Sequence, residues 1–181
     1  AIAQRLDALL RFYGVETLLL RDADVSLHDP SAATLREKKV SDLHNRVDII
    51  EAVPNAVLIS IHQNTYNHTR YHGAQVFYAN GELSRPFAVL TQETLRLALD
   101  PENTRQPAAI PTTVYLMNHI SCTAILVECG FLSNPREDAL LQTGSYQTKI
   151  SVALAASYLT YQQGGSPYEG EDPLLLHGVR Q

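Results

Sequence analysis

Hydrophobic residues recur at helical spacing in several stretches of the chain. In residues 1–13, for example, Ile2, Leu6 and Leu10 fall on one side of a helix. The same kind of spacing predicts further helices over residues 31–53, 84–99, 135–142 and 146–162. We expect Ser31 to cap the first of these, because a serine oxygen readily accepts a hydrogen bond from a free amide at a helix start.

Short apolar runs alternate with these helices and predict strands. The clearest run is residues 56–61, whose continuous apolar character is typical of a strand covered on both faces. The other expected strands are residues 16–20, 74–79, 114–117 and 124–127. Because strands and helices alternate, we expect an α/β domain with a mainly parallel, mixed and twisted sheet, flanked by helices in three layers.

Composition limits the function without defining it. The 181 residues suit one domain, which we assign to residues 1–163, and residues 164–181 are typical of a flexible C-terminal tail. Apolar residues make up 45%, which excludes a mainly disordered chain. A net charge of −5 without a basic stripe argues against nucleic acid as a partner, and no apolar run is long enough to span a bilayer.

The start of the chain has an unusual feature. No capping residue precedes the helix predicted at residues 1–13, because the chain begins at Ala1. We therefore expect the N-terminus to be cut inside an element, with the first strand of the sheet missing. A missing strand would leave part of the sheet uncovered.

Two predicted strands run directly into polar side chains. His62 follows residues 56–61, and Glu128 follows residues 124–127. Ligand sites in such sheets gather at the carboxyl ends of strands, so these two side chains could converge. His62 is either a hydrogen-bonded structural residue or a metal ligand. Glu128 belongs either to a structural ion pair or to general acid–base catalysis, since a carboxylate at the edge of a core needs a partner.

Other polar residues near these strands have structural explanations. Asn134 is expected to cap the helix that starts at Pro135, with Glu137 closing a capping box. His68 and His72 lie in the same polar loop as His62, where we favour the rim of a substrate groove over a self-contained three-histidine metal site.

The two cysteines, Cys122 and Cys129, lie on one predicted strand, about 23 Å apart at strand rise, which is too far for a disulfide. A thiol nucleophile at Cys129 would need a nearby base and an activated thiolate, and nothing local supplies either.

Three stretches resemble a known family. Residues 60–64 (SIHQN), 73–78 (GAQVFY) and 127–135 (VECGFLSNP) are similar to the zinc-dependent N-acetylmuramoyl-L-alanine amidases of the amidase-3 type. The resemblance extends in the right order over residues 1–162. Residues 35–47 and the Asn103-Thr104-Arg105 segment are closer still to the CwlD-like germination and sporulation branch.

The resemblance implies a chemistry for these residues. It implies one zinc ion (Zn²⁺) held by two histidines and a glutamate, with a separate glutamate as general base and acid. His62 matches the last zinc ligand and Glu128 matches the catalytic glutamate, while the other two ligands would lie upstream of Ala1. Asn64, Tyr71 and Gln75 are expected to bind the substrate. The reaction would cleave the amide between N-acetylmuramic acid and the L-alanine of the peptidoglycan stem peptide.

These expectations leave alternatives open. With one matched ligand, residues 1–181 alone are expected to show little amidase activity. A non-catalytic peptidoglycan-binding or regulatory domain, and a phage endolysin or vegetative autolysin, are the competing hypotheses. Peptidoglycan is the expected partner and an activating protein partner is unknown. The expected location is outside the cytoplasm, in the cell wall or the forespore intermembrane space, although the chain shows no signal segment.

Overall fold

A mixed sheet forms the middle layer of the molecule. The structure is a computed structural model that describes residues 1–21, 23 and 25–165. The strands are β1 (Val57–Asn64), β2 (Gln75–Tyr78), β3 (Ala108–Ala109) and β4 (Thr123–Phe131), and their order across the sheet is β1-β4-β2-β3. β1 is parallel to β4 and β2 is parallel to β3, whereas β2 and β4 are antiparallel.

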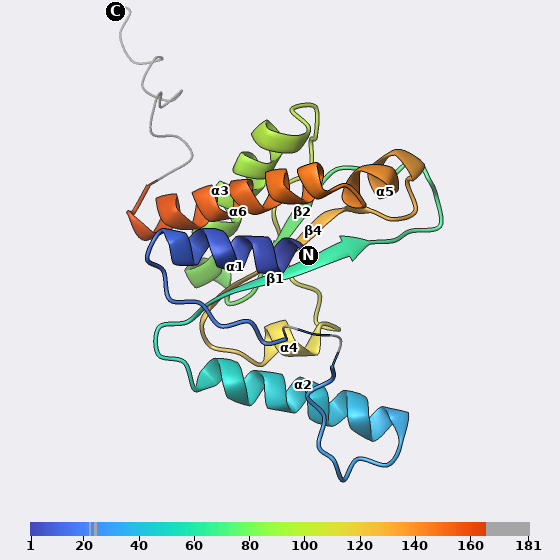
Figure 1. The fold of residues 1–181 in the computed structure, drawn as a ribbon, viewed down its shortest axis with the longest axis vertical. Helices are drawn as coiled ribbons and strands as arrows, with labels where there is room; N and C mark the ends of the chain where they lie inside the picture. Colours follow the sequence, from blue (N-terminus) through green and yellow to red (C-terminus); the bar gives the residue numbers. More distant parts are fainter. Residues whose placement is uncertain (22, 24, 166–181) are drawn as a thin grey trace, which may run out of the picture.

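Helices cover both faces of this sheet (Figure 1). α1 (Ile2–Phe12), α3 (Gly81–Leu99) and α6 (Gly144–Gln162) pack together on one face. α2 (Leu35–Glu51) and the short α4 (Tyr115–Asn118) cover the other, and α5 (Pro135–Leu141) follows β4. The expected three-layer α/β architecture is therefore confirmed. Residues 166–181 of the predicted tail lie outside the described residues.

β4 is the strand around which both halves of the core form. Ile125 and Val127 are fully buried in the cluster formed with α1, α3 and α6. Ala124 and Leu126 point the other way, into the cluster that includes Ile50 of α2. The alternation follows from the two-residue period of a strand, and its apolar character on both sides reflects a layer of helices on each face.

α2 begins four residues later than the sequence pattern predicts. Thr34, not Ser31, caps the helix: its hydroxyl accepts a hydrogen bond from the Glu37 amide at 3.2 Å. In return, the Glu37 carboxylate accepts one from the Thr34 amide at 2.9 Å. This reciprocal pair is a capping box, which satisfies two otherwise free amides and fixes where the helix starts.

Two predicted strands are wrong. Residues 115–118 form α4, because the Asn118 side chain donates hydrogen bonds to the carbonyls of Pro111 and Val114 and so closes a helical turn. Residues 16–20 run extended but pair with no strand. They are tied to α1 instead: the Thr17 hydroxyl donates to Asp7, and Arg11 donates to the Thr17 carbonyl at 2.8 Å.

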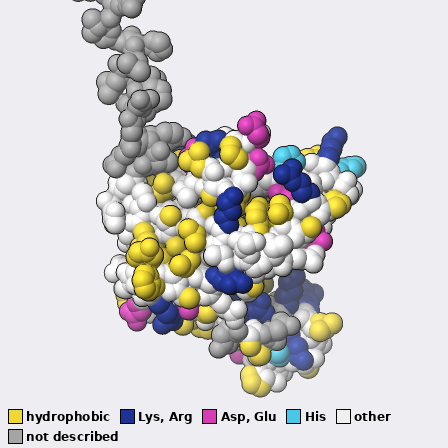
Figure 2. All heavy atoms as spheres, turned by 45° about the horizontal axis from the view of Figure 1, so that its top comes forward, with side chains coloured by type: hydrophobic (Ala, Val, Ile, Leu, Met, Phe, Trp, Pro, Cys, Tyr) yellow, Lys and Arg dark blue, Asp and Glu magenta, His cyan; other side chains and the backbone are white. Residues whose placement is uncertain are grey.

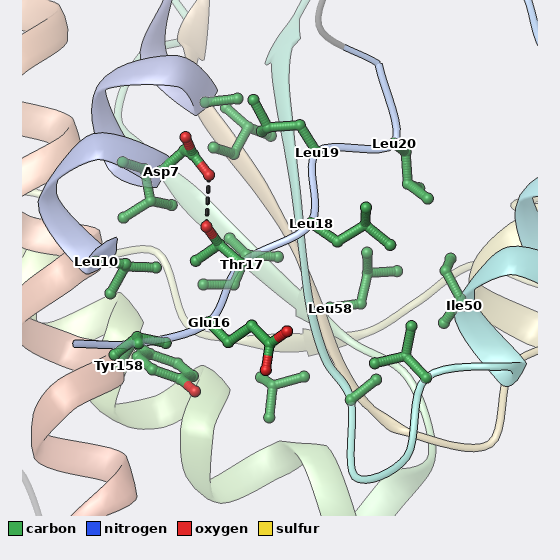
Figure 3. Close-up of a pocket in the computed structure, with 18 of the residues that line it drawn as sticks. Asp7, Leu10, Glu16, Thr17, Leu18, Leu19, Leu20, Ile50, Leu58 and Tyr158 are labelled. Atoms are coloured by element: carbon green, nitrogen blue, oxygen red, sulfur yellow. Dashed lines mark hydrogen bonds between the residues drawn. The ribbon is translucent and has the colours of Figure 1, made fainter. Parts of the chain in front are cut away.

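A cavity of about 520 Å³ lies between residues 16–20 and β1, with which these residues do not pair. It is lined by α1, residues 15–20, the end of α2 and β1. Figure 3 shows Asp7 facing Thr17 on one side, with Leu58 and Ile50 on the other. In the described part of the chain β1 is an edge strand with one unpaired side.

Candidate active site at the carboxyl end of β1 and β4

His62, Glu128 and Gln75 form a row across three strands. His62 on β1 is in register with Glu128 on β4, and Glu128 is in register with Gln75 on β2. Residues in register on neighbouring strands point to the same face of a sheet. That face is the one covered by α2, because Leu126, two residues before Glu128, packs in the cluster with Ile50. The strands thus bring together an imidazole, a carboxylate and an amide.

Glu128 is the most unusual group in this row. The residue is half-buried, and its Oε2 atom is buried without a hydrogen-bond partner among the described residues. Burial raises the pKa of the Glu128 carboxyl above its ordinary value, since a charge is less stable away from water. A carboxylate with a raised pKa is a stronger base than an ordinary carboxylate, which suits general base and acid chemistry.

His62 has an environment that favours the neutral imidazole. Its Nε2 atom lies 3.1 Å from the Ser60 hydroxyl. Partial burial, and then the positive charge of Arg46 on α2, lower the pKa of the ring. Neutral imidazole is the form that binds metal ions, so His62 is suited to act as a ligand.

The described residues do not complete a metal site. Within residues 1–21, 23 and 25–165, no three His, Cys, Asp or Glu side chains are grouped closely enough to hold a metal ion. His72 instead pairs with Asp100 at 3.5 Å, and His68 stacks loosely near Tyr66 and Tyr71. His62 is thus a single donor here, and one ligand is too few for the tetrahedral coordination that zinc adopts.

The loop after β1 forms an aromatic rim beside this row. Tyr71 lies between Tyr66, with ring centroids 4.9 Å apart, and Phe131 at the end of β4, at 6.4 Å. The Asn134 side chain donates to the carbonyls of Thr69 and Tyr71 at 2.9 and 3.3 Å, which ties the loop to the start of α5. Asn64 lies where β1 ends, after an irregularity in the register, and its carbonyl accepts from the Leu132 amide.

Glu137 has a role that the sequence analysis missed. Asn134 caps α5 as predicted, accepting from the amides of Arg136 and Glu137, but the Glu137 carboxylate does not close a capping box. It accepts from the Gly73 amide at 2.8 Å and from the Phe131 amide at 2.7 Å. The predicted capping box is wrong because the Glu137 carboxylate binds these two amides and not the Asn134 amide, which donates to the Phe131 carbonyl.

Asn103 and Arg105 hold Gln75 in place, at the end of the row opposite His62. A side chain at Gly73 would approach Asn103 Oδ1 to 2.7 Å, so only glycine allows this close contact. Asn103 Oδ1 accepts from the Arg105 amide at 3.0 Å. The Arg105 guanidinium in turn donates to Gln75 Oε1, at 3.0 Å. Sequence reasoning did not assign these residues to the site, although the Asn103-Thr104-Arg105 segment was the available signal.

The two cysteines are unpaired thiols, of which Cys122 is half-buried and Cys129 is buried. Cys122 and Cys129 are free, so the prediction that they do not pair is confirmed. Cys129 is fully buried, and burial together with the Glu128 charge raises its pKa to about 12. A thiol with this pKa remains protonated at neutral pH, which excludes it as a nucleophile.

Comparison with known proteins agrees with this geometry. The family model described as N-acetylmuramoyl-L-alanine amidase matches residues 1–158. The germination-specific N-acetylmuramoyl-L-alanine amidase of Bacillus subtilis is 32% identical over 170 residues, which cover 93% of this chain and 71% of that protein. The fold is that of an α/β domain with a glutamate near the carboxyl end of its central strand β4, and the family comparisons make it a hydrolytic domain. The chain belongs to the N-acetylmuramoyl-L-alanine amidase family and is a peptidoglycan hydrolase.

Solved structures show the same relationship. The CwlD amidase from Clostridioides difficile, solved in complex with the GerS lipoprotein, is 32% identical with a TM-score of 0.85, covering 90% of this chain and 83% of that one. The amidase AmiC2 of Nostoc punctiforme is 27% identical with a TM-score of 0.73, covering 90% and 81%. The α/β architecture is thus shared with these amidases.

Proposed function

We propose that Glu128 is the catalytic carboxylate for cleavage of the amide between N-acetylmuramic acid and L-alanine. The observation that carries this proposal is its half-buried carboxylate, with one unpartnered oxygen, in register with His62 and Gln75. Glu128 takes a proton from water as the water oxygen bonds to the amide carbon. It then delivers that proton to the alanine nitrogen as the carbon–nitrogen bond breaks. The raised pKa of Glu128 supports both transfers.

We propose that His62 provides one zinc ligand. Amidases of this family are generally zinc-dependent. When bound, zinc supplies polarisation of the amide carbonyl and of the attacking water. Because His62 is a single donor among the described residues, we expect residues 1–181 to bind zinc weakly. His62→Ala should remove the remaining affinity in a competition titration with a chromogenic chelator, whereas His119→Ala, at the end of α4, should not.

Asn64, Tyr71 and Gln75 are proposed to contact the substrate. Gln75 adjoins Glu128 directly, and Tyr71 belongs to the aromatic rim. The Tyr71 and Tyr66 rings offer flat apolar faces of the kind on which sugar rings pack. Figure 2 shows Lys or Arg and His side chains gathered on the side of the molecule that carries α5 and the loop after β1.

The similarity to characterised amidases supports a proposal for the biological setting of this chain. Identity of 32% with a germination-specific amidase supports a role in cell-wall or cortex remodelling during sporulation. Peptidoglycan lies outside the cytoplasm, so the enzyme acts there, and the finer proposal is the cell wall or the forespore intermembrane space. The CwlD amidase was solved in complex with a lipoprotein, which supports a protein partner for this chain as well. No described helix is both long enough and apolar enough to cross a membrane.

Release of L-alanine amino groups from purified muropeptides tests the catalytic proposal. In the full-length gene product supplied with zinc, Glu128→Gln should lower turnover by about 10² to 10⁴-fold. Glu82→Gln, an exposed change on α3, should leave turnover unaltered. Retained turnover in Glu128→Gln with zinc still bound would exclude Glu128 as the base.

A further inference from the structure

The Arg105 guanidinium is held rigidly beside the active-site row. Its Nε atom donates to the His72 carbonyl at 2.8 Å, and its Nη1 atom donates to Gln75 Oε1 at 3.0 Å. The guanidinium carbon also lies over the Phe131 ring, 4.7 Å from the centroid. Three contacts from three different segments thus fix the plane of this half-buried group before any ligand binds.

No carboxylate of the described residues neutralises this cation. The ion pairs in that part of the chain join Arg11 to Asp7, Arg46 to Asp42, His72 to Asp100 and Arg96 to Glu93. Arg105 takes part in none of them, and its Nη2 atom has no hydrogen-bond partner there. Of the five N–H groups of this half-buried guanidinium, three remain unused, one on Nη1 and two on Nη2. The Nη1–Nη2 edge is therefore a preformed site for an oxyanion, which one N–H from each nitrogen can hold in two parallel hydrogen bonds.

The position of Arg105 indicates how far from the scissile amide a substrate group held by its guanidinium would lie. Gln75 separates Arg105 from Glu128, and neighbouring strands are about 4.8 Å apart. The guanidinium therefore lies roughly 5–10 Å from the catalytic carboxylate. An extended peptide advances about 3.3–3.6 Å per residue. A substrate group held by Arg105 is thus one to two residues from the bond that Glu128 acts on, at the end of the row opposite His62.

We infer that Arg105 binds a free carboxylate of the stem peptide, one or two residues beyond the cleaved bond. This inference rests on the proposed role of Glu128, because that role places the scissile amide. The sugar side of the substrate has no negative charge next to the cleaved amide, whereas the peptide side carries carboxylates. Arg105 therefore orients the peptide and selects for acidic stem peptides over amidated ones.

Two ligands that differ in one group test the inference. N-acetylmuramoyl-L-alanyl-D-glutamate carries an α-carboxylate where N-acetylmuramoyl-L-alanyl-D-isoglutamine carries an α-carboxamide, and both carry the same γ-carboxylate. Calorimetric titration in a Glu128→Gln background measures the Kd of both without turnover. We expect the α-carboxylate ligand to bind at least about 10-fold more tightly, as a charge-assisted pair is lost with the amide. Arg105→Gln should bring the ratio of the two Kd values close to 1.

Control variants separate recognition from folding and from general charge. The ratio of the two Kd values is measured on one protein preparation, so a smaller fraction of folded protein does not change it. Arg105→Lys keeps the charge without the fork and should retain part of the preference. Arg85→Gln removes the same charge from α3, near the amino end of β4, and should leave the ratio unchanged.

The outcomes distinguish this inference from the proposed function. Equal binding of the two ligands, or a preference that survives in Arg105→Gln, overturns the role of Arg105 and leaves Glu128 untouched. If neither ligand binds the Glu128→Gln protein that retains Arg105, the proposed substrate site is overturned, and the inference with it.

Discussion

Glu137 shows how one side chain can organise the active site from outside it. Its two oxygens accept from the amides of Gly73 and Phe131, which belong to the loop before β2 and to the end of β4. These amides would otherwise lie partly buried without a partner, which is costly. Glu137 therefore acts on the site by positioning the segments that carry Gln75 and Glu128.

We expect Glu137→Ala to lower the free energy of unfolding by roughly 2–4 kcal/mol, because two amides lose a charged acceptor. Urea denaturation measures the change. Glu102→Ala removes an exposed carboxylate nearby and should alter stability by less than about 0.5 kcal/mol. Similar stabilities for the two variants would show that water replaces the Glu137 carboxylate without cost.

Glu128 should make the protein less stable as the pH rises. Its folded-state pKa is raised above the ordinary value of 4.5, so the folded chain holds this proton more tightly than the unfolded chain. The stabilising effect of the proton is present below about pH 4.5 and is lost as the pH rises through the folded-state pKa. Glu128→Gln cannot ionise and avoids this loss.

Glu128→Gln is thus expected to melt at a higher temperature than the parent protein at pH 7, with the difference shrinking towards pH 4. Differential scanning calorimetry from pH 3 to 8 checks this. An unchanged or lower melting temperature at pH 7 would contradict a carboxylate strained by burial. A stability gain combined with lost turnover is the pattern expected of a catalytic group.

At the scale of elements, Asp42 joins α2 to the chain segment before it. Its carboxylate accepts from Arg46 Nε at 2.7 Å, from the Leu27 amide at 2.7 Å and from the Ser26 hydroxyl at 2.9 Å. The Arg46 side chain is the main reason that the pKa of Asp42 falls to about 2. The ionised form therefore holds residues 26–27 against the helix.

Asp42→Asn should lower the free energy of unfolding by roughly 1–2 kcal/mol at pH 7. A lowered folded-state pKa means that this contribution is present above about pH 4 and is lost as the pH falls towards 2. Chemical denaturation at pH 7 and pH 2.5 measures it, with Asp48→Asn on the same helix as the exposed control. A difference that persists undiminished at low pH would contradict the ionic origin.

The apolar pattern alone predicted β1 and β4. The run of β4 is almost wholly buried and that of β1 is half-buried at the edge of the described sheet, and both are too short and apolar for a surface helix, so their type was predictable. Residues 16–20 have similar composition, but a strand also needs a partner, and their polar contacts go to α1. β3 has only two residues, too few for any period, and forms because it lies beside β2.

At the scale of the whole molecule, topology determined which site residues could be foreseen. His62 and Glu128 come directly after the apolar runs within β1 and β4, and the parallel pairing of these strands places them side by side. Arg105 follows no such rule, because it comes from a loop and reaches the row through Gln75 and the Phe131 ring. The hydrophobic pattern of the sequence predicts which residues lie at the ends of strands. Contacts between loops that are distant in sequence can be identified only in the folded structure.

Unequal pairing across the sheet predicts unequal local stability. β4 has a strand on each side and fully buried residues such as Ile125 and Val127, so its amides should exchange only on global unfolding. Residues 15–20 pair with no strand and face the cavity beside β1, held mainly by the Thr17 contacts with Asp7 and Arg11. Their amides should exchange through local opening, at a lower free-energy cost.

Hydrogen exchange followed by mass spectrometry checks this ranking, and Thr17→Val tests its cause. Removing the hydroxyl that donates to Asp7 should speed exchange in residues 15–20 while leaving β4 unchanged, because the tie is local to α1 and this segment. The Thr94→Val change on α3 removes a hydroxyl that bonds only within its own helix, so it should leave residues 15–20 as they are. Equal protection of residues 15–20 and β4 would mean that the segment and the sheet open as one cooperative unit despite the cavity between them.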